Sequence, residues 1–352
     1  MRVFVYGSST VEHAVLWRLT AGSRIAGLFC ADIGTSQLGL AKLLGGGRED
    51  PAELVSECRS RKVDVALLSP QEPGSIGLGT ELRRAGITVI APDEHTRRLE
   101  TTPSSMQSFA AQYGIPTGKP DDTDVTVFAL TDGRDVRSFS PCRRHVFTDR
   151  NGRGTAREIA GALTPVPWLD SSFLDRVQEE IIHRTVNALL DSKLHERGFL
   201  GFGIGGSNEG PVLSSMRFGF AEPEAALFMP LLDADFGALL EALAENRLAS
   251  EPFRMSDRYA LAFVLTNRSN AAIEFRNPAL ALPGFPGKNY AVFLSHAHKV
   301  RGEVSIEPGA TVTAVGLGRD PLQARQRALT LAGELAQSGL SFRKDVGSNI
   351  FV

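Results

Sequence analysis

A turn rich in glycine and hydroxyl groups lies close to the N-terminus and is the first candidate binding site. It follows the apolar segment Arg2 to Tyr6 and consists of Gly7, Ser8, Ser9 and Thr10. Open parallel sheets bind anions at such strand-to-helix turns, because free N–H groups and the helix dipole favour negative charge. The three hydroxyl groups therefore predict either contacts to a substrate phosphate or simple capping of the next helix.

Two ionisable residues after this turn are the catalytic candidates. Glu12 and His13 stand side by side in the sequence. Histidine titrates near neutral pH, and a buried carboxylate beside it could take part in acid–base chemistry. The alternative is that one side chain faces solvent while the other supports the adjoining loop. Both interpretations stay open at this point.

Two further groups of cationic or metal-binding residue types occur later. His296 and His298 lie on one face if Ala291 to Val300 forms a single strand, and two imidazoles could then bind a transition metal with a third ligand. No cysteine or carboxylate stands near them, so we predict no metal site. The run from Arg143 to His145 predicts either an anion site or a solvated loop.

The first hundred residues alternate between strand and helix patterns. This alternation is typical of a parallel sheet with crossover helices, and therefore of a small doubly wound α/β domain. The expected strands are 2–6, 24–30, 63–68 and 88–91, and the expected helices are 12–19, 51–61 and 77–85. Later helices are expected at 170–191, capped by Asp170 or Ser171, and at 321–338.

Composition limits the classes of partner. The chain has 352 residues, enough for two or three domains, and 38 basic against 40 acidic residues give a net charge of −2. This balance gives no electrostatic reason to expect nucleic acid or a membrane as partner. The N-terminus reads as a buried strand and not a secretory leader, and no apolar run reaches the length of a membrane span. Three widely spaced cysteines fit reduced thiols in a cytoplasmic protein.

Two segments in the middle of the chain carry a family resemblance. From Gly198 the sequence reads G-F-L-G-F-G-I, and from Pro211 it reads P-V-L-S-S-M-R-F-G-F-A-E-P-E. Together they resemble the phosphoribosylamine–glycine ligase family of the ATP-grasp superfamily, where this stretch reads roughly G-F-L-Y-x-G-L and V-I-E-F-N-x-R-F-G-D-P-E. In that family the Glu and Asn of E-F-N hold magnesium on the nucleotide phosphates.

The resemblance places no carboxylate at the two magnesium positions. Depending on the alignment register, the pair is Ser214 with Met216, Ser215 with Arg217, or Leu213 with Ser215. Magnesium prefers octahedral oxygen ligation through carboxylates and phosphates, so none of these pairs is a suitable replacement. We therefore expect descent from an ATP-dependent ligase in which the ATP and magnesium sites are lost, and no cofactor.

Other parts of the family pattern are altered in the same direction. Residues 7–14, G-S-S-T-V-E-H-A, resemble G-N-G-G-R-E-H-A, whose turn contributes to the phosphoribosylamine site in the family. Two lysines of the family pattern correspond to Pro103 and Gln107, in a helix for which Ser104 or Ser105 is the expected N-cap. Only 118–124 stand where the family has a mobile lid over the nucleotide. The ending F-R-K-D-V-G resembles F-R-x-D-I-G.

The resemblance implies three units. These are an N-terminal doubly wound parallel-sheet domain at 1–98, a truncated ATP-grasp-like α+β domain at 99–250 without its lid, and a C-terminal β-rich domain with a helix at 251–352. Loss of the lid would uncover surface, so a homodimer through that surface is a further expectation.

Three functions are compatible with this sequence. The first is a ligase-derived protein repurposed for small-molecule chemistry in specialised metabolism, with a phosphoribosyl compound, a nucleoside or an amino acid as ligand. The second is an inactive relative that binds a metabolite or a partner protein. The third is residual ligation of glycine. Fold does not decide between them, because function depends on the site.

Overall fold

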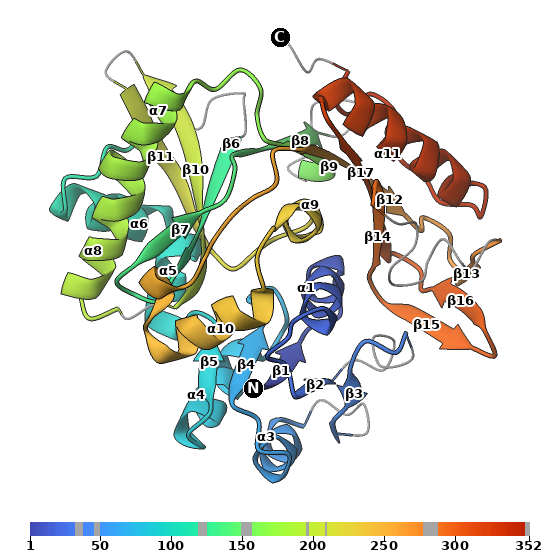
Figure 1. Ribbon diagram of the computed structural model, residues 1–352, viewed down its shortest axis with the longest axis horizontal. Coiled ribbons are helices and arrows are strands. Elements are labelled where there is room, and N and C mark those ends of the chain that lie inside the picture. Colours follow the sequence, from blue (N-terminus) through green and yellow to red (C-terminus); the bar gives the residue numbers. More distant parts are fainter. Residues whose placement is uncertain are drawn as a thin grey trace.

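The N-terminal unit is built around a parallel sheet. The computed structural model describes residues 1–31, 38–45, 50–118, 125–148, 157–194, 197–207, 210–276 and 288–348. The five strands of this sheet follow the order β3-β2-β1-β4-β5 (Figure 1). The direction of progression changes between β1 and β4, and such a switch point opens a crevice at the carboxyl ends of the strands. The strands are β1 (Arg2–Tyr6), β2 (Gly27–Cys30), β3 (Lys42–Leu43), β4 (Val65–Leu68) and β5 (Thr88–Ile90).

Helices cover both faces of this sheet, as the alternating sequence pattern predicts. Helix α1 (Thr10–Thr20) packs on the face that carries Val3 and Val5. Helices α3 (Pro51–Ser60) and α4 (Ser75–Arg84) pack on the opposite face, which carries Phe4. The doubly wound fold is therefore confirmed, and each helix and strand that was predicted for this unit differs from its predicted bounds by at most three residues.

Two short helices lead out of this unit. They are α5 (Glu94–Thr101) and α6 (Pro103–Gln112). The expected N-cap at Ser104 or Ser105 is wrong, because Pro103 occupies the first turn and Thr102 is the capping residue, without a side-chain bond. Proline suits this position, where its missing N–H leaves no acceptor unsatisfied.

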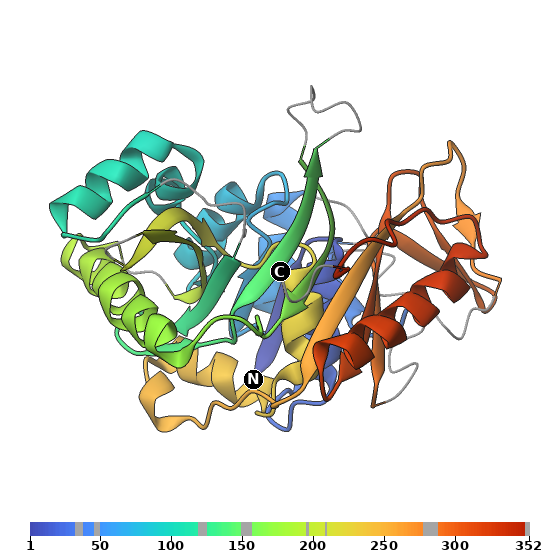
Figure 2. The same cartoon turned by 90° about the horizontal axis from the view of Figure 1, so that it is seen from above.

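A second, larger sheet spans the central and C-terminal segments. Its nine strands have the order β11-β10-β6-β8-β9-β12-β17-β14, with β7 paired to β6. The hairpin of β8 and β9 projects away from the rest of the sheet (Figure 2). The strands are β6 (Val125–Thr131), β7 (Val136–Ser138), β8 (Cys142–Thr148), β9 (Arg157–Thr164), β10 (Gly198–Ser207), β11 (Gly210–Phe218), β12 (Tyr259–Thr266), β14 (Tyr290–Leu294) and β17 (Thr311–Gly318).

The predicted helix at 170–191 covers one face of this sheet. It consists of α7 (Ser171–Arg176), a π-helical stretch (Val177–His183) and α8 (Arg184–Asp191). Its N-cap is Asp170, whose carboxylate accepts a 2.7 Å bond from the N–H of Phe173. This layer, together with α6, packs on the side chains of β10 and β11 that point to the same face.

The opposite face of the large sheet meets the N-terminal unit. Helix α9 (Glu224–Leu231) shares one apolar core with α1 and with the aromatic residues of β6 and β10. Helix α10 (Phe236–Glu245) joins the same core and is followed by a 3₁₀ turn (Leu248–Ser250). The central strands therefore lie over the crevice at the carboxyl ends of the parallel strands.

The C-terminal segment adds a helix and a small sheet. Helix α11 (Pro321–Ala336) packs on β12 and β17, as Figure 1 shows. The small sheet has the order β13-β16-β15, with β13 (Ile273–Glu274), β15 (Ala297–Val300) and β16 (Glu303–Ile306). Because β9 pairs with β12, one sheet runs on past residue 250. The domain boundaries at 98 and 250 stay a prediction.

One expected strand is interrupted. The segment from Ala291 to Val300 is divided into β14 and β15, and His296 between them has a φ of 43°. A positive φ turns the chain, so His296 and His298 do not share one strand face and the expectation is wrong. Within the residues that the structure describes, no helix is both long and apolar enough to cross a membrane.

Candidate functional site

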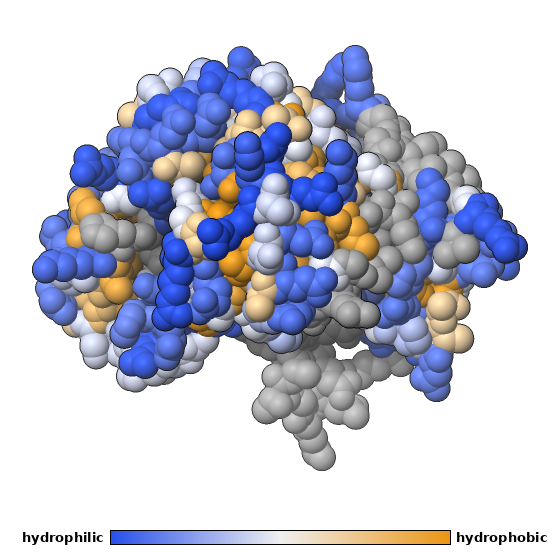
Figure 3. Space-filling model, turned by 90° about the horizontal axis from the view of Figure 1, so that it is seen from below, coloured by the Kyte–Doolittle hydropathy of each residue, from blue (hydrophilic) through white to orange (hydrophobic). Residues whose placement is uncertain are grey.

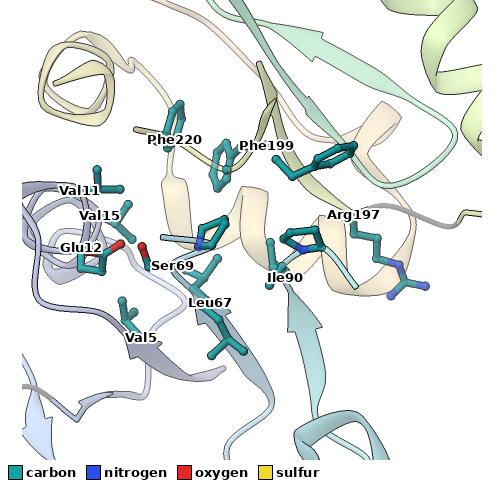
Figure 4. Close-up of a pocket in the computed structure, with 16 residues that line it drawn as sticks. Val5, Val11, Glu12, Val15, Leu67, Ser69, Ile90, Arg197, Phe199 and Phe220 are labelled. Atoms are coloured by element: carbon teal, nitrogen blue, oxygen red, sulfur yellow. The ribbon is translucent and has the colours of Figure 1, made fainter. Parts of the chain in front are cut away.

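A narrow pocket lies at the switch point of the parallel sheet. It is bounded below by the carboxyl ends of β1, β4 and β5, on one side by α1, and above by the central strands (Figure 4). Its volume is about 50 Å³, which is room for a few non-hydrogen atoms. The lining is mainly apolar and comprises Val5, Val11, Glu12, Val15, Leu67, Leu68, Ser69, Pro70, Ile90, Ala91, Pro92, Arg197, Phe199, Phe218, Gly219 and Phe220.

The turn from Gly7 to Thr10 lies beside this pocket and caps the N-terminus of α1. The hydroxyl of Ser9 accepts a bond from the N–H of Val11 at 3.1 Å, and Glu12 completes a capping box. Thr10 donates its hydroxyl to Glu222 at 2.6 Å, and the Ser8 carbonyl accepts from the N–H of His296 at 3.1 Å. These contacts use the polar groups of the turn for capping and for ties to distant segments.

None of the four candidate binding residues lines the pocket. Those residues are Gly7, Ser8, Ser9 and Thr10. Gly7 has a φ of 139°, and a Cβ there would lie 2.7 Å from the Glu12 carboxyl carbon. The glycine is therefore required for close approach of the Glu12 side chain. Their role in substrate binding stays a prediction.

Glu12 is the acidic residue in the lining of the pocket. Its Oε2 accepts the N–H of Ser9 at 3.0 Å and the Ser9 hydroxyl at 2.6 Å. Burial raises the pKa of Glu12, and hydrogen bonds from Ser9 and Ser69 partly oppose that rise. Figure 4 shows the Glu12 carboxyl group and the Ser69 hydroxyl facing each other. They give a mainly apolar pocket one polar corner.

His13 points away from Glu12. Its Nδ1 accepts the N–H of Leu294 at 2.9 Å, and its ring meets Phe293 edge to face. Burial lowers the pKa of His13 to about 4. The structure thus does not bring the two catalytic candidates together. Neither side chain faces solvent, since Glu12 is 4 % and His13 2 % exposed.

The strand β11 carries the residues that the resemblance places at the family's metal positions. Leu213 and Met216 are buried beneath the helical layer of α6 to α8, so they cannot face a ligand on the other side. Ser214 is the extra residue of a bulge opposite Gly203. Side chains two apart on a strand share a face. Of the three pairs, Ser215 and Arg217 are the one whose two side chains share the face away from the helical layer, and which residues occupy the metal positions stays a prediction.

Arg217 fills its position with a fixed positive charge. Its guanidinium donates a 2.7 Å bond to Oε1 of Glu224, which is fully buried, and lies 5.2 Å from the centre of the Phe128 ring. Gly201 of β10 stands between Arg217 and Phe128 in the strand register, so no side chain separates them. Arg144 of β8 approaches the same carboxylate at 3.8 Å.

This arrangement does not fit magnesium. Ser215 and Arg217 offer a hydroxyl group and a guanidinium on this face, and a guanidinium repels a divalent cation. Among the described residues, no group of three or more His, Cys, Asp or Glu side chains is placed to hold a metal ion. His298 instead contacts Glu307, with 2.7 Å between Nε2 and Oε1.

The run from Arg143 to His145 lies in strand β8, so its expectation as a solvated loop is wrong. The guanidinium of Arg143 lies 4.9 Å from the centre of the Trp168 ring. Burial, aided by the charge of Arg143, lowers the pKa of His145 to about 4. Arg144, which approaches Glu224, therefore has different surroundings from Arg143 and His145, and an anion site at this run stays a prediction.

Sequence reasoning missed two features of this region. Phe199 and Phe220 line the pocket with their rings 4.3 Å apart, and no sequence pattern links the two positions. The sequence interpretation assigned no role to Glu224, although a buried acid needs a cation. An arginine at a metal position followed by an acid seven residues later is the signal that could have indicated this pair.

The fold and this geometry define an ATP-grasp-like protein, and comparisons with known proteins identify its family. The family model "Phosphoribosylglycinamide synthetase, N domain" matches residues 1–100, and that for the ATP-grasp (A) domain of the same enzyme matches 120–225. The chain therefore belongs to the phosphoribosylamine–glycine ligase family of the ATP-grasp superfamily.

Relatives match along the whole chain at low identity. The phosphoribosylamine–glycine ligase of Rhizobium meliloti is 23 % identical, with 99 % of this chain and 98 % of the relative covered. The trifunctional purine biosynthetic protein adenosine-3 of Drosophila melanogaster is 22 % identical, and the match covers 99 % of this chain but 32 % of that protein. The Rhizobium match runs over 415 positions against 352 residues here, so at least 63 positions of it have no counterpart.

Solved structures share the fold. The crystal structure of phosphoribosylamine–glycine ligase from Thermotoga maritima matches with a TM-score of 0.73 at 16 % identity, covering 98 % of this chain and all of that one. The biotin carboxylase domain of a single-chain bacterial carboxylase matches with a TM-score of 0.67 at 13 % identity, covering 97 % and 90 %.

Proposed function

We propose that this family member does not ligate glycine with ATP and magnesium, and that it binds a small molecule in the pocket at the switch point of the parallel sheet. The observation that supports this proposal most is the ion pair of Arg217 with buried Glu224. We place its guanidinium where the family binds a magnesium ion. The short connection at 118–124 in place of the lid adds to this argument. No ATP or metal cofactor is required for binding.

The pocket favours a ligand whose buried part is small and apolar. Binding sites for drug-sized molecules usually measure roughly 300–1,000 Å³, well above the 50 Å³ available here. Val11 replaces the arginine of the family motif, and Arg197 lies across the pocket from Glu12 (Figure 4). A phosphate next to the buried Glu12 carboxyl would be poorly stabilised. An amino acid or amine with a short aliphatic chain fits this lining better than a phosphoribosyl group.

Two other functions follow from different observations. The relatives carry the name phosphoribosylamine–glycine ligase and align over nearly the whole chain, which supports residual ligation of glycine as the second candidate.

A partner-binding pseudoenzyme, the third candidate, would expose a large apolar patch. Within the described residues the exposed large apolar side chains are Trp168 and Leu322, which lie in different parts of the fold. Figure 3 shows orange residues in the middle of one face, with blue and white residues among them.

A thermal-shift panel tests the proposed ligand class. L-valine, L-leucine, isobutylamine, glycine and ribose 5-phosphate would be titrated against the purified protein. A ligand at 100 times its dissociation constant stabilises the folded state by about 2.7 kcal/mol. We expect a stabilising shift with the branched aliphatic compounds that is lost in Val11→Phe, and no shift with ribose 5-phosphate that depends on this pocket. A shift with ribose 5-phosphate that Val11→Phe abolishes, without a shift for the aliphatic compounds, would contradict the proposal and favour the phosphoribosyl interpretation.

A matched pair of variants places the binding. Val11→Phe fills the mouth of the pocket, whereas Val55→Phe adds the same volume to α3 on the opposite face of the sheet. The first variant should abolish the aliphatic shift and the second should keep it. Equal loss in both would mean that the ligand binds elsewhere. ADP formation from ATP, glycine and phosphoribosylamine should stay at the level of a protein-free control.

A further inference from the structure

A second, polar pocket lies far from the switch point, at the edge of the C-terminal segment. It forms where β12 begins, β17 ends and α9 ends, and it has a volume of about 550 Å³. Its lining shares no residue with the apolar pocket and comprises Pro230, Leu231, Leu232, Asp233, Arg254, Ser256, Asp257, Arg258 and Arg319. Neither the family resemblance nor the proposed function uses it.

Two arginines share the same uncharged hydrogen-bond acceptors. One of them lines this pocket, and the other lies next to it. Arg258 donates to the side-chain oxygen of Asn289 at 2.7 Å and to the Leu317 carbonyl at 3.1 Å. Arg327 donates to the same two oxygens, at 3.3 Å and 2.5 Å. Both guanidinium groups therefore crowd around the same neutral oxygens. Partial burial, together with the charges of Arg327 and Arg319, lowers the pKa of Arg258.

A third arginine increases the local excess of positive charge. Arg319 lines the pocket with an exposed side chain. In the part of the chain that the structure describes, no salt bridge reaches Arg258, Arg319 or Arg327. The sequence of 277–287, which precedes Lys288, contains no acidic residue.

In the described part of the chain, no salt bridge joins the acidic residues of this region to the three arginines. Asp233 contacts Arg254 at 3.7 Å, and Asp320 caps α11 by accepting the N–H of Gln323 at 2.8 Å. Asp257 lines the pocket with an exposed side chain. Among the described residues, the positive charges of Arg258, Arg319 and Arg327 therefore have no direct acidic partner, although the whole chain has a net charge of −2.

We propose that this pocket binds the phosphate group of a small metabolite through Arg258 and Arg319, with Arg327 supporting Arg258. Guanidinium groups present paired N–H donors that match the oxygens of a phosphate, and a doubly charged anion relieves the repulsion between neighbouring arginines. The pocket is larger than inorganic phosphate, so it has room for the organic part of a phosphorylated ligand.

Isothermal titration with inorganic phosphate at low ionic strength tests the site. We expect saturable binding to the unmodified protein and at least tenfold weaker binding to Arg319→Gln, because a hydrogen bond to a charged group is lost. Arg319 is exposed, so this variant should fold normally. Arg258→Gln should weaken binding further, and circular dichroism would show whether it folds. Glucose 6-phosphate, compared with glucose, would show whether an organic phosphate binds there too.

A matched control separates a site from general charge attraction. Arg84→Gln removes an exposed arginine from α4, in another part of the fold, and should leave the phosphate affinity unchanged. Chloride at equal ionic strength should not compete. Equal losses in Arg84→Gln and Arg319→Gln, or no saturable binding to the unmodified protein, would overturn the proposal. The switch-point pocket variant Val11→Phe should bind phosphate normally, so this test is independent of the proposed function.

Discussion

The turn after β1 and the strand β11 both resemble their family motif, but their side chains differ from it in opposite ways. At the turn, hydroxyl groups cap α1, and Val11 lines the pocket where the motif has an arginine. At β11, Arg217 stands at a metal position of the motif in one of the three alignments, and buried Glu224 holds it. In that alignment the turn lacks a cation of the motif and β11 has an additional one.

This contrast shows how a fold can persist while the side chains at its motif positions differ. The turn is held by local hydrogen bonds that depend on Ser9 and Glu12. The strand is held by an ion pair and by the packing of Arg217 on Phe128. In both places, side chains of the protein itself contact the polar groups.

Removal of the buried carboxylate should have the largest effect on stability. Glu224→Gln removes the negative charge that Arg217 contacts, and breaking a buried pair in this way costs about 3–5 kcal/mol. Urea unfolding would measure the change. Glu94→Gln breaks an exposed ion pair with Arg98 on α5 and should cost less than about 0.5 kcal/mol. Similar losses in the two variants would mean that the β11 pair is not a buried structural contact.

The pH dependence of stability should come next in size. Burial holds the pKa of His13 at about 4 in the folded protein, against the ordinary histidine value of 6.5, so the unfolded chain binds the proton more readily. The contribution of neutral His13 to the free energy of unfolding is complete above pH 6.5 and is lost as the pH falls from 6.5 towards 4. The loss between about pH 7.5 and pH 5 should be on the order of 2 kcal/mol.

A variant isolates that contribution. His13→Gln keeps an acceptor for the N–H of Leu294 but cannot titrate. The free energy of unfolding, measured at both pH values, should therefore fall less in the variant than in the unmodified protein. An equal fall in both proteins would show that His13 is not responsible.

The close approach across β10 gives a smaller predicted loss. A Cβ on residue 201 would lie 2.7 Å from the Phe128 ring, so Gly201→Ala displaces the ring on which Arg217 packs. Overpacking of this kind costs about 1–3 kcal/mol. Gly333→Ala in α11 is the control, because its added Cβ meets nothing within 4 Å. Denaturant unfolding of both variants compares the two sites directly.

The N-cap of α1 should have the smallest effect. Ser9→Ala removes the hydroxyl that caps Val11 and contacts Glu12, which should cost about 1 kcal/mol. The melting temperature would report this loss. Unchanged stability would indicate that the hydroxyl is not a structural cap and would make it a binding candidate again.

Much of the fold could be predicted from the sequence because its signals are local. The alternation of strand and helix indicated the parallel sheet, and Asp170 marked the start of α7 correctly. The break at His296 could not be foreseen, since a positive φ there depends on contacts with the N-terminal turn. Glu12 faces the pocket and His13 contacts Leu294, and these positions also depend on segments that are distant in the sequence.

The missing carboxylates were visible in the sequence, but the alignment register was not. The bulge at Ser214 and the helical layer over Met216 show which side chains of β11 share a face, and the register itself stays a prediction. The apolar pocket was missed because its walls come from β1, β4, β5 and the strands around residue 220, which are far apart in the chain.

Isothermal titration of the full chain with ATP, in the presence and absence of magnesium, tests the central claim most directly. With Arg217 paired to Glu224 at the metal position, we predict no binding of ATP that depends on magnesium. Saturable ATP binding that requires magnesium would contradict this proposal and would support an active ligase.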